Sequence, residues 1–229
     1  YAQQNLPVYT RSLPPNDPFW DGQWNLHKIG ALSMWSESNE GKTLDGTPIV
    51  VAVLEPTGFD IVHEDLSEQI WVNEKEVPFD QLDNDENGYV DDYLGWNALN
   101  QNDDHSNRVS HGTRVAGLLS ATNNNGIGVA AVGWNTKLLL LSGSIYEAQV
   151  IENYLYVLHQ RQRFNETNGK EGSLVVATNA SFGRAGELSP IWCAVYDELG
   201  EAGILSVSAA DNNPINIDLR SDMPTSCAS

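Results

Sequence analysis

Residues 49–54 read I-V-V-A-V-L, a short apolar run that ends directly before an acidic residue, Glu55. A nearly continuous apolar run of this length is typical of a strand that is buried on both faces of a parallel sheet. Three similar runs follow along the chain, at K137-L-L-L-L141, L174-V-V-A-T-N179 and I204-L-S-V-S-A209. The sequence therefore predicts a parallel sheet built from these four runs.

Helical segments separate the apolar runs. Apolar residues recur at three- and four-residue spacing within 147–164 and within 190–202, and a third helix is expected at 111–121. Gly203 follows the second of these segments, where a C-terminal cap belongs. The alternation of strands and helices predicts an α/β fold, a doubly wound parallel sheet with helices on both faces.

The two ends of the chain differ from this body. Residues 1–48 are rich in proline and aromatic residues and show little periodicity. We expect them to form an extended arm that packs on the body through its aromatic side chains, with a short helix near 29–38. Residues 49–229 are the body, and their polar last segment, 213–229, contains no closing helix.

Composition excludes several classes of function. The 229 residues are 41% hydrophobic and 19% charged, which is ordinary for a globular domain. The net charge of −19 would repel a polyphosphate, so nucleic-acid binding is not expected. No run approaches the roughly 18 apolar residues of a membrane span. The sequence begins at Tyr1 rather than Met, so we expect that any signal or pro-segment has been removed or left out.

Polar segments follow the predicted strands. In a doubly wound sheet, ligand sites lie beyond the carboxyl ends of the strands. This rule places Glu55, the loop after Leu141, residues 181–183 and residues 211–213 on one rim. His111 opens the helix at 111–121, and a carboxylate beside it would orient the ring and stabilise its charged form.

Four segments together resemble the subtilisin-like serine proteases. They are H111-G-T-R-V-A-G117 with N124-N-G-I-G-V-A-A-V-G133, I49-V-V-A-V-L-E-P-T-G-F-D60 with H63-E-D-L66, V176-A-T-N-A-S-F-G183, and G203-I-L-S-V-S-A-A-D-N212. The resemblance implies a secreted endopeptidase in which His111 is the general base, Glu55 its orienting acid and Asn212 the oxyanion donor. It also implies that Ser181, Phe182 and Gly183 bind the substrate. Secreted members from Bacteroidetes-type bacteria are especially similar.

The sequence departs from the family pattern at the acid. The family has Asp-Ser/Thr-Gly after the first strand, whereas this chain has E55-P-T-G58, a longer acid and one extra residue. Glutamate has one more methylene than aspartate, so it reaches the histidine only if the backbone withdraws. The inserted residue allows such a withdrawal, although a degraded site remains an alternative interpretation.

The nucleophile of the family is absent from the chain. Its serine lies in G-T-S-x-A-x-P, and no such motif occurs here. The tail from Pro224 to Ser229 reads P-T-S-C-A-S and imitates the motif, but Ser226 lies only 14 residues beyond Asn212. That interval leaves no room for the strands and helix that would return the serine to the site.

Three explanations remain open for the missing serine. The mature enzyme is cut after Ser229 and a second chain carries G-T-S-x-A; or the site is defunct and the fold is a peptide-binding scaffold; or the sequence is truncated. We expect the first. A lone N-terminal half leaves an unpaired apolar sheet edge, which favours a partner segment in any folded form.

The chain has two cysteines, which form either a disulfide or two free buried thiols. In an exported protein a disulfide is the expected state of a cysteine pair. Cys193 and Cys227 are therefore interpreted as partners that tie the tail to the helix before the Asn212 strand.

Residues 83–92 read D-N-D-E-N-G-Y-V-D-D and resemble the start of a calcium loop. Alternate oxygen-bearing side chains and a glycine for the sharp turn are the features that such a loop needs. The sequence predicts a calcium site. Its expected ligands are Asp83, Asp85, Asn87, the carbonyl of Tyr89, and Asp91 or Asp92.

Overall fold

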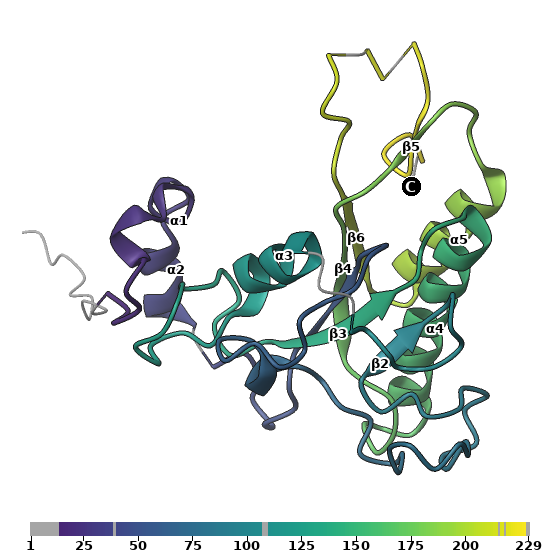
Figure 1. Ribbon diagram of the computed structural model, residues 1–229, viewed down its shortest axis with the longest axis horizontal. Helices are drawn as coiled ribbons and strands as arrows, with labels where there is room; N and C mark the ends of the chain where they lie inside the picture. The colour runs from purple at the N-terminus through teal and green to yellow at the C-terminus, as the bar shows by residue number, and fades with distance from the viewer. Residues whose placement is uncertain (1–13, 39, 107–109, 215, 218, 228–229) are drawn as a thin grey trace, which may run out of the picture.

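The computed structural model describes residues 14–38, 40–106, 110–214, 216–217 and 219–227. Its centre is a sheet of five parallel strands in the order β2-β3-β1-β4-β6 (Figure 1). In chain order the elements are η1 (Trp20–Gly22), α1 (Trp24–Lys28), α2 (Ala31–Glu37), β1 (Val50–Leu54), η2 (Ser67–Gln69), β2 (Gly95–Asn97), α3 (Ser110–Ser120), β3 (Lys137–Ser142), α4 (Glu147–Glu166), β4 (Val175–Ala180), β5 (Arg184–Ala185), α5 (Pro190–Glu201), β6 (Leu205–Ser208) and β7 (Asp222–Met223).

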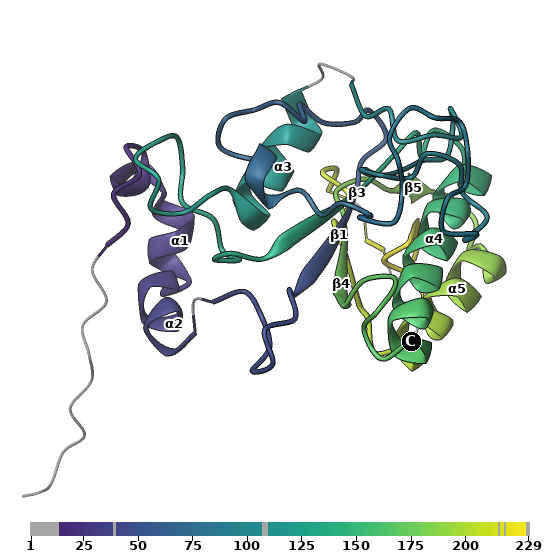
Figure 2. The same ribbon diagram turned by 90° about the horizontal axis from the view of Figure 1, so that it is seen from below.

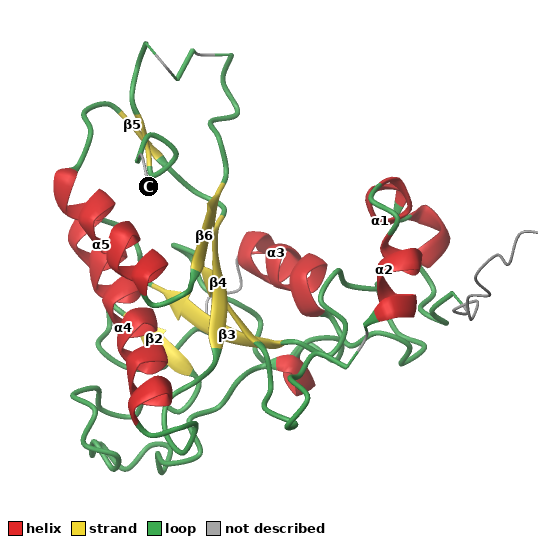
Figure 3. Cartoon of the chain, turned by 180° about the vertical axis from the view of Figure 1, so that it is seen from behind, coloured by secondary structure: helices red, strands yellow, loops and turns green. Residues whose placement is uncertain are grey.

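Helices cover both faces of the sheet, so the predicted α/β architecture is confirmed. Strand β1 lies between β3 and β4, and its side chains alternate between two cores. Ala52 and Leu54 pack with α4 and α5, whereas Val53 packs with α3. Figures 1 and 3 show α3 on one side of the strands and the α4–α5 pair on the other.

The four predicted strands and the three predicted helices of the body are present within a few residues of their expected ends. The edge strand β2 was not predicted, because G-W-N is too short to form an apolar run. Gly95 adopts a φ of 104°, and a Cβ there would lie 2.2 Å from the carbonyl oxygen of Leu140. A glycine is therefore what lets β2 begin directly against β3.

The segment before β1 contains more helix than the sequence indicated. Helix α2 lies within the expected range, and α1 precedes it. The rings of Trp20 and Trp35 lie 5.4 Å apart, and Trp35 meets Trp134 at 5.0 Å. Trp24, in contrast, is exposed. Figure 2 shows α1 and α2 at one end of the molecule, beyond α3.

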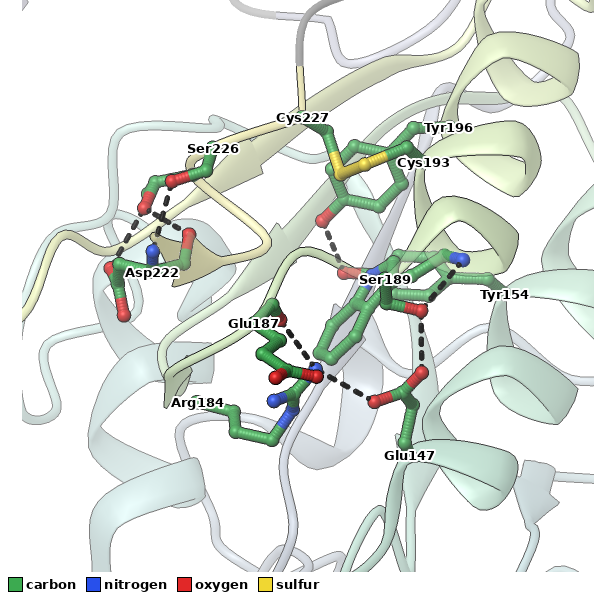
Figure 4. The surroundings of a disulfide bond; sticks show 12 residues. Glu147, Tyr154, Arg184, Glu187, Ser189, Cys193, Tyr196, Asp222, Ser226 and Cys227 are labelled. Atoms are coloured by element: carbon green, nitrogen blue, oxygen red, sulfur yellow. Dashed lines mark hydrogen bonds and ion pairs between the residues drawn. A yellow bond between two sulfur atoms is a disulfide. The ribbon is translucent and has the colours of Figure 1, made fainter. Parts of the chain in front are cut away.

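The end of the chain folds back toward α5. Strand β7 pairs antiparallel with β5, which follows β4. Cys227 forms the predicted disulfide with Cys193 of α5, with a Cα–Cα distance of 5.1 Å (Figure 4). None of the described helices combines the length and the apolar character needed to span a membrane.

We expect the disulfide to contribute substantially to stability. The bond closes a loop across 34 positions of sequence. The loss of unfolded-state entropy for such a loop corresponds to about 4 kcal/mol. Replacing both cysteines, as C193S/C227S, should lower the free energy of unfolding by about this amount in urea titrations without reductant. An unchanged unfolding midpoint would contradict this expectation.

Candidate functional site

Glu55 and His111 meet at the carboxyl end of β1. The hydrogen bond between His111 Nδ1 and Glu55 Oε2 is 2.8 Å long. Gly112 follows the histidine, and a Cβ there would lie 2.3 Å from the carbonyl oxygen of Gly58 and 3.1 Å from Cγ of Glu55. The loop after β1 thus lies directly against the first turn of α3, and the longer acid reaches the histidine in this arrangement.

The surroundings of the two side chains differ sharply. The Glu55 side chain is 1% exposed, whereas that of His111 is 58% exposed. Burial raises the pKa of Glu55, and the hydrogen bond and charge of His111 oppose this increase. Oε1 of Glu55 is buried and has no hydrogen-bond partner among the described residues. The carboxylate is therefore shielded from solvent, and one of its oxygens is hydrogen-bonded to the histidine.

This geometry prepares the imidazole to act as a base. A carboxylate beside Nδ1 favours the tautomer in which Nδ1 carries the imidazole proton. Nε2 is then unprotonated and can accept a proton. Since the side chain is half-exposed, Nε2 is accessible to a reacting group. Within the described ranges, the only hydrogen-bond partner of the ring is Glu55.

Asn212 and the residues after β4 share one cavity. Its volume is about 160 Å³, and its walls include Ser181, Phe182, Gly183 and Asn212. Asn212 is exposed. Strands β4 and β6 are parallel neighbours, so their carboxyl ends deliver these two segments to the same place. Asp211 and Asp222 also line the cavity, and Asp222 was missed because it lies in the irregular tail.

The serine of the tail has a structural role. Ser226 Oγ accepts a hydrogen bond of 2.9 Å from the backbone N–H of Asp222. Its own N–H donates to the carbonyl of Asp222 at 2.8 Å, which closes a turn beside the disulfide. Ser226 therefore belongs to the turn that holds β7.

His105 has polar neighbours in sequence, which favour a solvated side chain, but it lies in the interior. The ring is buried, with Nδ1 2.7 Å from Ser142 Oγ and Nε2 3.2 Å from the carbonyl oxygen of Leu94. Burial lowers its pKa to about 4, so the ring is neutral at pH 7. Its polar sequence neighbours hid this position, because only the fold brings β3 and the Leu94 carbonyl to the same ring.

Three carboxylates gather in and beside the acidic loop. The side chains of Glu76, Asp83 and Asp85 place one oxygen each within 4.8 Å of one another. Glu76 is buried, and its Oε2 has no hydrogen-bond partner among the described residues. The sequence motif did not indicate Glu76, since this residue lies seven positions before Asp83.

The other expected ligands of the loop have different partners. Asp91 accepts hydrogen bonds from the backbone N–H groups of Asp80 and Gln81. Asp92 is fully buried, and burial raises its pKa to about 6. Its oxygens accept hydrogen bonds from Asn73, Asn87, Tyr156 and Gln160. Asn87 Oδ1 accepts from the N–H of Tyr89. Asp92 therefore ties the loop to α4 and lies outside the three-carboxylate group.

Comparisons with known proteins agree with this fold. The profile of the subtilase family (Peptidase S8) matches residues 46–228. The subtilisin-like protease 1 of Plasmodium vivax is 33% identical over 132 residues, which cover 57% of this chain and 20% of that protein. The extracellular basic protease of Dichelobacter nodosus is 26% identical over 93% of this chain and 36% of its own length.

A solved protease structure from Pseudoalteromonas arctica superposes with a TM-score of 0.66 at 22% identity. The match covers 94% of this chain and 63% of that one. The chain thus spans about a fifth of the Plasmodium relative and about a third of the Dichelobacter relative.

The buried carboxylate predicts a pH-dependent effect of Glu55→Gln. A raised pKa means that the folded state favours protonated Glu55, so ionisation costs stability as the pH rises through the folded pKa. Glutamine resembles the protonated form. The free energy of unfolding of the variant should match the native value near pH 4 and exceed it increasingly toward pH 8, measured by urea titration. The exposed Glu64→Gln is the control, and a pH-independent difference would contradict the burial argument.

Proposed function

This chain belongs to the subtilase family, and we propose that it is the N-terminal part of the catalytic domain of a secreted serine endopeptidase. The observation that carries the proposal is the 2.8 Å hydrogen bond between His111 Nδ1 and Glu55 Oε2. A buried carboxylate in this position orients the imidazole and stabilises the imidazolium that forms during acyl transfer. The glutamate therefore performs the role of the family's aspartate.

The proposed mechanism assigns one step to each described residue. His111 removes the proton of the attacking serine through Nε2 and later delivers it to the leaving amine. Asn212 donates its side-chain amide to the oxyanion of the tetrahedral intermediate. Ser181–Gly183 follow β4 on the same rim, and their backbone is positioned to hold the extended peptide beside Asn212.

We assign the nucleophilic serine to a C-terminal segment held as a second polypeptide carrying G-T-S-x-A. The edge strand β6 supports this assignment. Its side chains Leu205 and Val207 are exposed, and its outer backbone edge faces no strand among the described residues. An exposed apolar edge favours a covering segment. Export is supported by the disulfide, which forms in oxidising compartments, and by the extracellular relative.

The alternative is a non-catalytic scaffold that binds a peptide along residues 181–183. The observation that favours it is that no described serine is hydrogen-bonded to the His111 ring. The two functions differ in one chemical property, which is whether the assembled protein contains a serine that His111 activates.

A serine-directed phosphonate probe distinguishes these functions. In the natively purified protein we expect labelling, and His111→Ala should slow it by about 10³-fold, a typical contribution of a general base. The exposed His63→Ala should label at the native rate. Glu55→Gln should also slow labelling, because the base loses its orienting carboxylate.

Denaturing intact-mass spectra of the same sample locate the serine. A labelled second polypeptide supports the two-chain enzyme. A single unlabelled species near the 25.2 kDa of this chain, folded and unreactive, would replace it with the scaffold.

We also propose that Glu76, Asp83 and Asp85 hold a structural calcium ion. Hard carboxylate oxygens are the preferred ligands of calcium, and Glu76 Oε2 lacks any other partner among the described residues. The ion would neutralise the mutual repulsion of the three carboxylates. The Tyr89 carbonyl remains a predicted ligand of the same loop, whereas the predicted side-chain ligands Asn87, Asp91 and Asp92 have hydrogen-bond partners elsewhere.

Chelation tests this calcium site. Calcium at about 100 times its Kd contributes about 2.7 kcal/mol, so EDTA should lower Tm by about 5–10 °C. Glu76→Gln should abolish this calcium-dependent shift, whereas the exposed neighbour Glu74→Gln should retain it. The site would be excluded if native Tm were the same with EDTA and with calcium.

A further inference from the structure

The cavity beside Asn212 contains a buried acid that the mechanism does not use. Asp222 lies on β7, is 2% exposed and lines this cavity of about 160 Å³ together with Ser181–Gly183. We propose that the cavity binds a lysine or arginine side chain of the substrate, with the Asp222 carboxylate as its counter-charge. The inference rests on the proposed endopeptidase function, because it assigns this side chain to the residue whose carbonyl is attacked.

The position of Asp222 relative to Gly183 supports this role. A Cβ on Gly183 would lie 3.4 Å from Asp222 Oδ1 and 2.8 Å from the carbonyl oxygen of Met223. Glycine therefore lets β7 approach the substrate-binding segment. The other oxygen, Oδ2, accepts a hydrogen bond of 2.7 Å from Thr225 Oγ1. One oxygen of the carboxylate is thus fixed, and the other lies against residue 183 at the cavity wall.

The charges around the cavity favour a cation. Asp211 adds a second carboxylate, and the described lining contains neither lysine nor arginine. Two basic residues adjoin the lining in sequence. Arg220 lies two residues before Asp222, is exposed and does not line the cavity. Arg184 follows Gly183 and has other partners. Its guanidinium lies 3.0 Å from Glu147 Oε2 and donates to the carbonyl of Glu187 at 3.0 Å (Figure 4). A buried carboxylate without a cationic partner carries a desolvation cost that a bound ammonium or guanidinium offsets.

The support behind Asp222 is rigid. Ala185 pairs with Asp222 across the β5–β7 ladder, and Ser226 bonds both the N–H and the carbonyl of Asp222. Cys227 is the next residue, and its disulfide joins this turn to α5. Figure 4 shows Asp222, Ser226 and Cys227 on one turn beside that helix. A carboxylate held from several sides keeps its position when a charged ligand enters.

The location of the cavity indicates that its ligand is a side chain of the substrate. Asn212, the proposed oxyanion donor, lines the same cavity, so the attacked carbonyl lies at its mouth. The side chain of that same residue is then the nearest group that can enter. In an unrelated class of serine proteases, an aspartate in the corresponding pocket selects basic side chains by the same physics.

The test compares peptide substrates that differ only at this residue. Arginine and lysine substrates are measured against norleucine, an uncharged chain of similar length, with the complete protein. We expect native kcat/KM to favour the basic substrates. Asp222→Asn keeps the shape and the contact with Thr225, and should reduce the arginine-to-norleucine ratio on the order of 100-fold, the typical loss when one partner of a buried pair is removed. The exposed Asp197→Asn is the matched control and should keep the native ratio.

A second measurement does not depend on turnover. Product-like peptides ending in arginine should bind more tightly than those ending in norleucine in calorimetry, and Asp222→Asn should remove the difference. Equal affinities, or a native enzyme that cleaves norleucine substrates as well as basic ones, would overturn the role of Asp222 while leaving the endopeptidase intact. If the endopeptidase function itself is wrong, neither cleavage nor phosphonate labelling will be observed. The calorimetry would then still show whether the cavity binds a basic side chain.

Discussion

Strand β1 is the constraint on which the site depends. It is hydrogen-bonded to β3 on one side and to β4 on the other, and both its faces are buried beneath helices. Since a one-residue slip would exchange the two faces, the register of β1 is strongly specified. Glu55 is the first residue after it and is therefore fixed at the rim. The hydrogen bond to His111 follows from packing on both sides of the sheet.

The electrostatic effect of each buried acid depends on its hydrogen-bond partners. Glu55 is buried with one oxygen directed at His111, and Asp92 is buried among four side-chain donors. Glu76 and Asp222 each retain a carboxylate oxygen with no recorded hydrogen bond among the described residues. A buried acid whose oxygens all accept hydrogen bonds from the protein stabilises the fold. A buried acid with an oxygen that accepts no hydrogen bond favours the binding of a cation. This difference connects the proposed calcium site and the proposed basic pocket.

The pKa of Glu55 reflects two opposing effects of its surroundings. Burial raises the pKa of Glu55, and the hydrogen bond and charge of His111 only partly offset this increase, so a positive charge on the ring stabilises the ionised carboxylate. In the proposed mechanism, such a charge develops on the ring during acyl transfer, after the base has accepted a proton. A buried carboxylate would then stabilise the charge that develops in the reaction more than it stabilises the resting state.

The sequence was sufficient to predict the four long strands and three body helices, because buried parallel strands and amphipathic helices leave periodic patterns. The sequence also predicted Glu55 and His111 as site residues, through the family motifs that contain them. It could not determine whether a glutamate reaches the histidine, since that depends on the close approach of Gly112 to the loop after β1. The burial of His105, the position of Glu76 beside Asp83 and Asp85, and the position of Asp222 in the Gly183 cavity likewise depend on the tertiary structure. Each arises from contacts between segments distant in the chain, and such contacts leave no periodic signal.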